Sequence, residues 1–247
     1  MRFLLATQIK TVCDNLGIPY IFKASYDKAN RSSLASYRGP GFPEGLQILD
    51  NIKNTLNVPV LSDIHETSQV EKAAQVLNVL QIPAFLCRQT DLLVEVARTG
   101  KPINIKKGQF LAPHDMKNIV EKVSSQGNTN ILLTERGTSF GYNNLVFDVR
   151  SIPIMKNLGF PVVIDASHSV QKPGGEGAYS GGDAEFIPHV AAAGIAAGAD
   201  GIFLEIHDDP PKALSDGNNS LILNKLENIL RALTRVKNAI QDKKNPV

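Results

Sequence analysis

Residues 18–33 read Ile18-Pro-Tyr-Ile-Phe-Lys-Ala-Ser-Tyr-Asp-Lys-Ala-Asn-Arg-Ser-Ser33. The apolar run Ile18–Phe22 predicts a buried strand, and a loop with three cations, Lys23, Lys28 and Arg31, follows it at once. Cations crowded onto one loop repel each other, so a fold tolerates them best where an anion lies between them. Taken alone, the loop favours the simpler interpretation of a basic loop in solvent. The rest of the chain decides between the two.

The same order, an apolar run followed by polar residues, recurs along the chain and alternates with amphipathic stretches. Such alternation predicts a parallel sheet covered by helices, an α/β protein. The length of 247 residues suits one (β/α)8 TIM barrel domain over residues 1–247, since such barrels have about 250 residues. Further strands are predicted at 58–63, 79–83, 102–105, 130–134, 161–164 and 201–204. Helices are predicted at 2–16, 43–56, 68–77, 91–99, 114–125, 149–157, 184–197 and 221–240.

The count of elements is uneven, with seven predicted strands and eight helices, because the chain opens with a helix. A closed barrel of this type begins with a strand. We therefore expect that the first strand is missing from this chain, through truncation or a misplaced start. The alternative is an open seven-stranded sheet, which leaves two strand edges unpaired.

Composition narrows the classes of partner and compartment. A net charge of +2 gives no reason to expect a nucleic-acid or membrane partner. The only cysteines, Cys13 and Cys87, indicate neither a disulfide framework nor a cysteine metal cluster, and Cys13 lies on the apolar stripe of the first helix. No stretch approaches the ~18 apolar residues of a membrane span. We expect a soluble, cytoplasmic protein.

Ionisable residues follow every predicted strand. In a barrel of this kind the active site lies at the C-terminal ends of the strands. Charges at seven successive strand ends favour a site over a solvated surface, although structural charge networks also occur there. Strand by strand, these residues are Lys23, Asp63 with His65, Arg88, Lys106, Arg136, His168, and Glu205 with His207.

Alternation of side chains along a strand selects between neighbours at these ends. Around the isoleucines of 103–105, Asn104 and Lys106 are expected to point into the barrel, whereas Lys107 is interpreted as a peripheral charge. The same argument points Glu205 and His168 inward.

His168, Glu205 and Asp216 form a candidate metal set, because one nitrogen and two carboxylates suit Zn²⁺, Fe²⁺ or Mn²⁺. Simpler interpretations stay open. Asp216-Gly217 is a typical turn, His168 fits a core histidine or a proton shuttle, and Glu205 fits an ion-pair partner.

The glycine-rich run 173–182 lacks the lysine and hydroxyl of a phosphate-binding P-loop, so we expect a mobile lid there, with a shorter loop at 137–141. The strand ends supply at least five cations, with Arg88 as a sixth candidate. One phosphate needs two or three. The sequence therefore predicts a site for two anionic small molecules and a reaction that joins them.

Five segments closely resemble the 3-deoxy-D-manno-octulosonate 8-phosphate synthase family. They are 23–33, Gln81-Ile-Pro-Ala-Phe-Leu-Cys-Arg-Gln-Thr-Asp91, Asn104-Ile-Lys-Lys-Gly-Gln-Phe110, Glu135-Arg-Gly-Thr-Ser-Phe-Gly-Tyr-Asn-Asn144 and Asp165-Ala-Ser-His-Ser-Val-Gln171. The likeness runs from about residue 15 to the end. The sister heptulosonate 7-phosphate synthases have Lys-Pro-Arg-Thr-Ser where this chain has Lys28-Ala-Asn-Arg-Ser32, which makes that family the weaker candidate.

The resemblance implies a transferase of lipopolysaccharide core sugar biosynthesis that condenses phosphoenolpyruvate with D-arabinose 5-phosphate in a homotetramer. It implies that phosphoenolpyruvate is held by lysines and Arg136, that the sugar phosphate is held by residues 30–32, and that Arg88 reaches a neighbouring subunit's site. The catalytic residues so implied are Lys23, Lys28, Asn30, Lys106 and His168. The substrate-binding residues so implied are Lys23, Ser25, Lys28, Asn30, Arg31, Ser32, Asp63, His65, Gln81, Ala84, Arg88, Lys106 and Arg136.

The resembled family has metal-dependent and metal-independent classes. The run Ser169-Val-Gln-Lys-Pro-Gly-Gly175 is more similar to the metal-dependent class, which implies that His168, Glu205 and Asp216 are ligands. The fourth ligand of that class, a cysteine on the first strand, is not in this chain. Two alternatives remain, another phosphoenolpyruvate-dependent sugar-acid synthase and an inactive barrel that only binds phosphoenolpyruvate.

Overall fold

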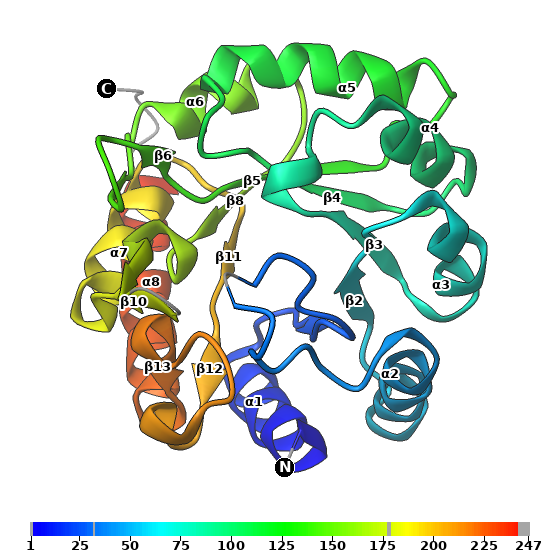
Figure 1. Cartoon of the computed structure of the whole chain (residues 1–247). Coiled ribbons are helices and arrows are strands. Elements are labelled where there is room, and N and C mark those ends of the chain that lie inside the picture. The colour runs from blue at the N-terminus through cyan, green and yellow to red at the C-terminus, as the bar shows by residue number, and fades with distance from the viewer. Residues whose placement is uncertain (1, 32, 177–178, 242–247) are drawn as a thin grey trace.

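The protein is described here by a computed structural model covering residues 2–31, 33–176 and 179–241 (Figure 1). Its centre is a curled sheet with helices on the outside. The sheet runs in the order β1 (Phe22–Lys23), β2 (Val60–Asp63), β3 (Val79–Ile82), β4 (Ile103–Lys106), β5 (Ile131–Glu135), β8 (Val162–Asp165) and β11 (Gly201–Phe203). Every neighbouring pair in it is parallel. The prediction of an α/β protein with a parallel sheet is confirmed.

Helices follow the strands around the outer face of the sheet. They are α1 (Arg2–Leu16), α2 (Phe42–Leu56), α3 (Val70–Val76), α4 (Thr90–Arg98), α5 (Met116–Ser124), α6 (Ser151–Lys156), α7 (Ile187–Ala196) and α8 (Leu226–Gln241). Each buries one apolar stripe, as α4 does with Leu92, Leu93, Val96 and Ala97. Several predicted helices begin with a 3₁₀ turn instead, such as Thr67–Gln69 before α3.

The sheet does not close within the described residues. β1 pairs with β2 and β11 pairs with β8, but β1 and β11 do not pair with each other. The full (β/α)8 barrel is therefore not confirmed. The described strands form a curled, open seven-stranded sheet, which fits both a barrel that lacks its first strand and the open-sheet alternative. β1 is also shorter than the predicted strand 18–22, because Pro19 has no N–H to donate and the strand has a partner on one side only.

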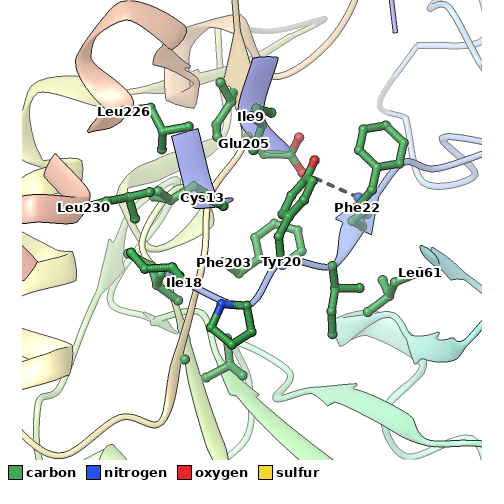
Figure 2. A pocket seen from close by; sticks show the side chains of 18 of the residues that line it. Ile9, Cys13, Ile18, Tyr20, Phe22, Leu61, Phe203, Glu205, Leu226 and Leu230 are labelled. Carbon is green, nitrogen blue, oxygen red and sulfur yellow. Dashed lines mark hydrogen bonds and ion pairs between the residues drawn. The ribbon is translucent and has the colours of Figure 1, made fainter. Parts of the chain in front are cut away.

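A cavity of about 1010 Å³ lies along this opening (Figure 2). Apolar side chains of α1 and α8, including Ile9, Cys13, Leu226 and Leu230, form one wall. Lys23 and Glu205 line it too, so the cavity reaches the polar end of the sheet. Cys13 is buried in the core as expected, and both cysteines are free thiols.

The glycine-rich run 173–182 contains more regular structure than the predicted loop. β9 (Gln171–Glu176) and β10 (Tyr179–Gly182) pair as antiparallel strands, and residues 177–178 of the predicted lid lie outside the described residues. Two further small sheets pair β6 (Thr138–Ser139) with β7 (Leu145–Val146), and β12 (Ile206–His207) with β13 (Leu221–Ile222). Within the described part of the chain, no helix has the length and apolar character to cross a membrane.

Candidate active site

A layer of hydrogen-bonded polar side chains crosses the inside of the sheet. Thr134 Oγ1 donates to Asn104 Oδ1 (2.6 Å), Asn104 Nδ2 donates to Gln81 Oε1 (2.8 Å), and Gln81 Nε2 donates to Asp63 Oδ1. Ser25 Oγ donates to the other oxygen of Asp63 (2.6 Å). The inward direction predicted for Asn104 is therefore confirmed. Because buried polar groups need partners, this layer fixes the strand ends relative to one another.

The side chain of Lys23 contacts residues on both sides of the opening in the sheet. Its Nζ donates to Ser25 Oγ (3.0 Å) and lies 3.6 Å from Asp63 Oδ2 and 3.5 Å from Glu205 Oε1. Burial by itself lowers the pKa of Lys23, but Asp63, Glu205 and two further carboxylates outweigh it, so the pKa is raised. Burial likewise opposes ionisation of Asp63, yet Lys23 and the Ser25 hydrogen bond hold the pKa of Asp63 below its ordinary value.

Lys106 makes the shortest ion pair of the site, with its Nζ 2.6 Å from Asp165 Oδ2. It points inward as predicted, lies 3.4 Å from His168 Nδ1, and sits 4.4 Å from the centre of the Phe203 ring. Burial lowers the pKa of Lys106, and Asp165 opposes that shift. The pKa of Asp165 is lowered despite burial, by His168 and Lys106.

Arg136 is a buried cation with unused donors. Only 6% of the residue is exposed, its Nη2 donates to Gln171 Oε1 (3.1 Å), and its Nε and Nη1 have no partner. Burial lowers its pKa, with Asp165 the largest opposing charge. A buried guanidinium that lacks partners is costly, so Arg136 indicates a binding position for an anion.

The cationic loop 23–33 reaches the far side of the site. Lys28 Nζ donates to Asp216 Oδ2 (2.9 Å), and Arg31 Nη2 donates to the carbonyl of Leu214 (3.4 Å). The Nε of Arg31 is buried without a partner. Asn30 is exposed.

The remaining predicted substrate-binding residues lie at the same end of the sheet but outside these ion pairs. His65 is half-buried with an unpartnered Nδ1, and burial lowers its pKa. Ala84 begins a 3₁₀ turn after β3, and Arg88 is exposed. Ser32 lies outside the described residues.

The candidate metal ligands carry other partners. His168 Nδ1 lies 2.8 Å from Asp165 Oδ2, Lys23 pairs with Glu205, and Lys28 pairs with Asp216. Because a carboxylate can only accept, Nδ1 of His168 is its protonated nitrogen, which leaves Nε2 to face a ligand when the ring is neutral. Among the described side chains, no three or more His, Cys, Asp or Glu lie close enough to form a metal site.

Two charged residues differ from the sequence interpretation. Lys107 is not peripheral but fully buried, because the chain turns at Gly108 and the lysine folds under the loop that follows β4. Asp165, which the sequence reasoning did not select, is fully buried and pairs with Lys106 and His168. Its place at the end of β8, three residues before His168, is the signal that would have found it.

The amino-acid sequence is similar to those of a known protein family. The model of the DAHP synthetase I family matches residues 2–242. Proteins of Geobacter sp. (strain M21), Trichlorobacter lovleyi and Geobacter sulfurreducens, each named 2-dehydro-3-deoxyphosphooctonate aldolase, are 61%, 60% and 57% identical to this chain. The matches cover 94%, 92% and 94% of this chain and 85%, 84% and 85% of these relatives.

The lowered pKa values predict a loss of stability in acid. In the folded chain the pKa values of Asp63, Asp165, Glu205 and Asp216 lie below their ordinary values. Their contribution is fully present above the unfolded-state values of about 4 and is lost as the pH falls further. We expect the free energy of unfolding, measured by urea denaturation from pH 7 to pH 3, to fall below about pH 4.

The variant Asp165→Asn tests the same prediction by removing one of these carboxylates. At pH 7 the variant should lose about 3–5 kcal/mol, because Lys106 is left buried without its partner charge. It should then lose less than the unaltered chain on acidification. An unfolding free energy that rises toward pH 3 would contradict the assignment of these carboxylates.

Proposed function

The chain belongs to the DAHP synthetase I family, and on this premise we propose that it condenses phosphoenolpyruvate with D-arabinose 5-phosphate and water. The products are 3-deoxy-D-manno-octulosonate 8-phosphate and phosphate. This is the activity expected from the name that its relatives carry, and it assigns the chain to lipopolysaccharide core sugar biosynthesis. The buried, partly unpartnered Arg136 beside Lys106 is the observation that carries the proposal.

The cations suit phosphoenolpyruvate, which has a phosphate and a carboxylate. Arg136 supplies two unpartnered nitrogens and lies near enough to Lys106 to lower the pKa of that lysine. An anion between the two would reverse that shift. Lys23, which also lies near enough to lower the pKa of Lys106, is paired with Glu205, and Lys28 is paired with Asp216. Several cations around one site suit the two anionic groups of one small molecule.

The reaction follows from charge. The enol carbon of phosphoenolpyruvate attacks the sugar aldehyde, and the positive charge that develops on the neighbouring carbon is captured by water. The bond between this carbon and the oxygen that bridges it to phosphorus then breaks, and phosphate leaves. Arg136 and Lys106 stabilise the departing phosphate, and His168, held by Asp165, orients the water or the aldehyde.

We assign the sugar phosphate to Asn30, Arg31 and Ser32. The unpartnered Nε of Arg31 supports this position. We also propose a homotetramer in which Arg88 reaches a neighbouring site. Arg88 is exposed, and the exposed aromatic rings of Phe85 and Phe110 lie at the same strand ends. Light scattering on the purified chain tests the assembly.

We propose further that His168, Glu205 and Asp216 hold a divalent cation, Zn²⁺, Fe²⁺ or Mn²⁺. The donor types fit, and the bond from Nδ1 of His168 to Asp165 is the arrangement that orients a histidine ligand. Such an ion, when bound, polarises an aldehyde or a water molecule. In this structure the three side chains are not gathered into a metal cluster, and Lys23 and Lys28 are paired with the two carboxylates, so a cation would have to displace these lysines.

We propose that the opening between β1 and β11 takes an eighth strand, which completes a (β/α)8 barrel. Two unpaired edges of a parallel sheet flank the opening, and an apolar wall covers its outer side. The N–H groups of Phe22 and Ala24 donate to the carbonyls of Pro59 and Leu61, so the N–H of Lys23 faces the opening.

The weaker alternative is a heptulosonate 7-phosphate synthase, which takes a four-carbon sugar phosphate. The family description allows it, but the compared relatives are named 2-dehydro-3-deoxyphosphooctonate aldolase. A chain that binds phosphoenolpyruvate without turnover is the second alternative. Measuring phosphate release with each sugar phosphate distinguishes the proposed function from these two alternatives.

We expect the chain to release phosphate from phosphoenolpyruvate when D-arabinose 5-phosphate is added, and far less with erythrose 4-phosphate. If the proposed metal is required, a chelator should abolish release and Zn²⁺ or Mn²⁺ should restore it. Preference for erythrose 4-phosphate would establish the alternative synthase. Binding of phosphoenolpyruvate without release from either sugar would establish the binding protein.

Arg31→Ala should raise the KM for arabinose 5-phosphate about 10- to 100-fold, the effect of losing charge-assisted hydrogen bonds to phosphate. The KM for phosphoenolpyruvate should stay within about twofold. Arg38→Ala is the matched control, since Arg38 lies on the same segment but pairs with Asp27 (2.6 Å, Nε to Oδ1). Equal losses for both substrates in Arg31→Ala would refute the assignment.

Peptides of about eight residues, a usual strand length, test the proposed strand. They tile the part of the Geobacter sp. relative that lies outside the match. We expect one of them to slow hydrogen exchange at the Lys23 amide and to raise the rate of phosphate release, with no effect at the Asn128 amide as control. Complete tiling with no protected amide would rule out a strand from this source.

A further inference from the structure

Lys107 is a fully buried lysine without a role in the site described above. Its Nζ donates to the carbonyl oxygens of Gly108 (3.2 Å), Leu111 (3.2 Å) and Gly137 (3.4 Å) and to Oγ1 of Thr138 (3.2 Å). An ammonium has three N–H donors, so every donor has an acceptor. The cost of burying this charge is offset only inside this set of contacts.

Glu135 completes the arrangement from the next strand. Its Oε1 lies 3.6 Å from Lys107 Nζ and accepts the backbone N–H groups of Arg136 (3.0 Å) and Gly137 (2.6 Å). Gly137 has a φ of +87°, a conformation that favours glycine. Lys107 and Glu135 therefore hold both the donors and the carbonyl of this sharp turn.

These contacts connect two loops that carry the phosphate-binding cations. Lys106 directly precedes Lys107 at the end of β4, and Arg136 lies in the turn that Lys107 and Glu135 hold. The N–H of Ser139 also donates to the carbonyl of Gln109 (2.8 Å), so the loops are joined by backbone as well. An anion bound beside Arg136 does not have to contact Lys107 or Glu135.

We propose that Lys107 is a positioning residue that fixes Arg136 relative to Lys106 and thereby sets the affinity for the phosphate of phosphoenolpyruvate. The inference rests on the proposed function for its substrate, but not for its geometry. The guanidinium of Arg136 has one side-chain hydrogen bond, to Gln171, so its direction depends mainly on the turn beneath it. Because Lys107 holds this turn, it also fixes the direction of the Arg136 guanidinium.

The test uses the double variant Lys107→Met with Glu135→Gln. Methionine fills the volume of the lysine without its charge, and glutamine keeps an oxygen for the two N–H groups, so no unpaired charge is buried. We expect the affinity for phosphoenolpyruvate and for inorganic phosphate, measured by titration calorimetry, to fall about 10- to 100-fold, as misplacement of a binding group does. The KM for arabinose 5-phosphate should stay within about twofold.

Asn128→Ala is the control for a purely structural loss. Asn128 is buried and donates to the carbonyls of Ala97 (3.1 Å) and Lys101 (2.9 Å), at the opposite ends of the strands. It should lower the melting temperature without changing phosphate affinity. A folded double variant with unchanged affinity for both ligands would overturn the proposal.

Thr138→Val covers the case in which the double variant does not fold. It removes one acceptor of Lys107 and keeps the rest, so we expect about a two- to tenfold loss of phosphate affinity, the effect of one hydrogen bond. No loss in that variant would also overturn the proposal. If the unaltered chain releases no phosphate with arabinose 5-phosphate, the proposed function fails, while the phosphate titrations still test Lys107.

Discussion

The ion pair between Lys106 and Asp165 is the interaction on which the site depends. Both groups are buried, and a buried charge persists only when it is paired and hydrogen-bonded. Asp165 meets this constraint twice, since it also holds Nδ1 of His168. The carboxylate therefore fixes a cation and a histidine at once, and the cation lies over the Phe203 ring. Among the described residues Arg136 has no such carboxylate partner, so the positive charge that remains for a ligand is concentrated on it.

The charges of the two lysines on the cationic loop are balanced differently. Lys23 and Lys28 each face a carboxylate, Glu205 and Asp216 respectively. These pairs are less buried than Lys106 and Asp165, and they are the pairs that a metal or a substrate would have to rearrange. The site thus combines one half with deeply buried ion pairs, built on β4, β5 and β8, with one half whose ion pairs are more exposed. Such a division suits a reaction in which a fixed phosphate leaves and a second molecule enters.

Whether the sequence predicted a feature depends on how far apart in the chain the interacting residues lie. The parallel sheet and the inward Asn104 and Lys106 follow from local patterns, because apolar runs and alternation are properties of neighbouring residues. The pairing of Lys106 with Asp165 joins strands far apart in the chain, and no local pattern contains it. Lys107 was misjudged for a related reason. Alternation assumes that the strand continues, but the chain turns at Gly108 and the long side chain folds beneath the turn. The short β1 and the pairing of β9 with β10 likewise depend on which edges find partners.

The open sheet has a consequence for association as well as for catalysis. β1 and β11 present two different edges with the same strand direction. An edge of one molecule can therefore accept the opposite edge of another, a head-to-tail contact that does not close on itself and grows into filaments. The charge of Lys23, which lines the cavity between these edges, opposes that contact. A segment that paired with both edges would therefore also prevent this growth, because it would remove both growing ends at once.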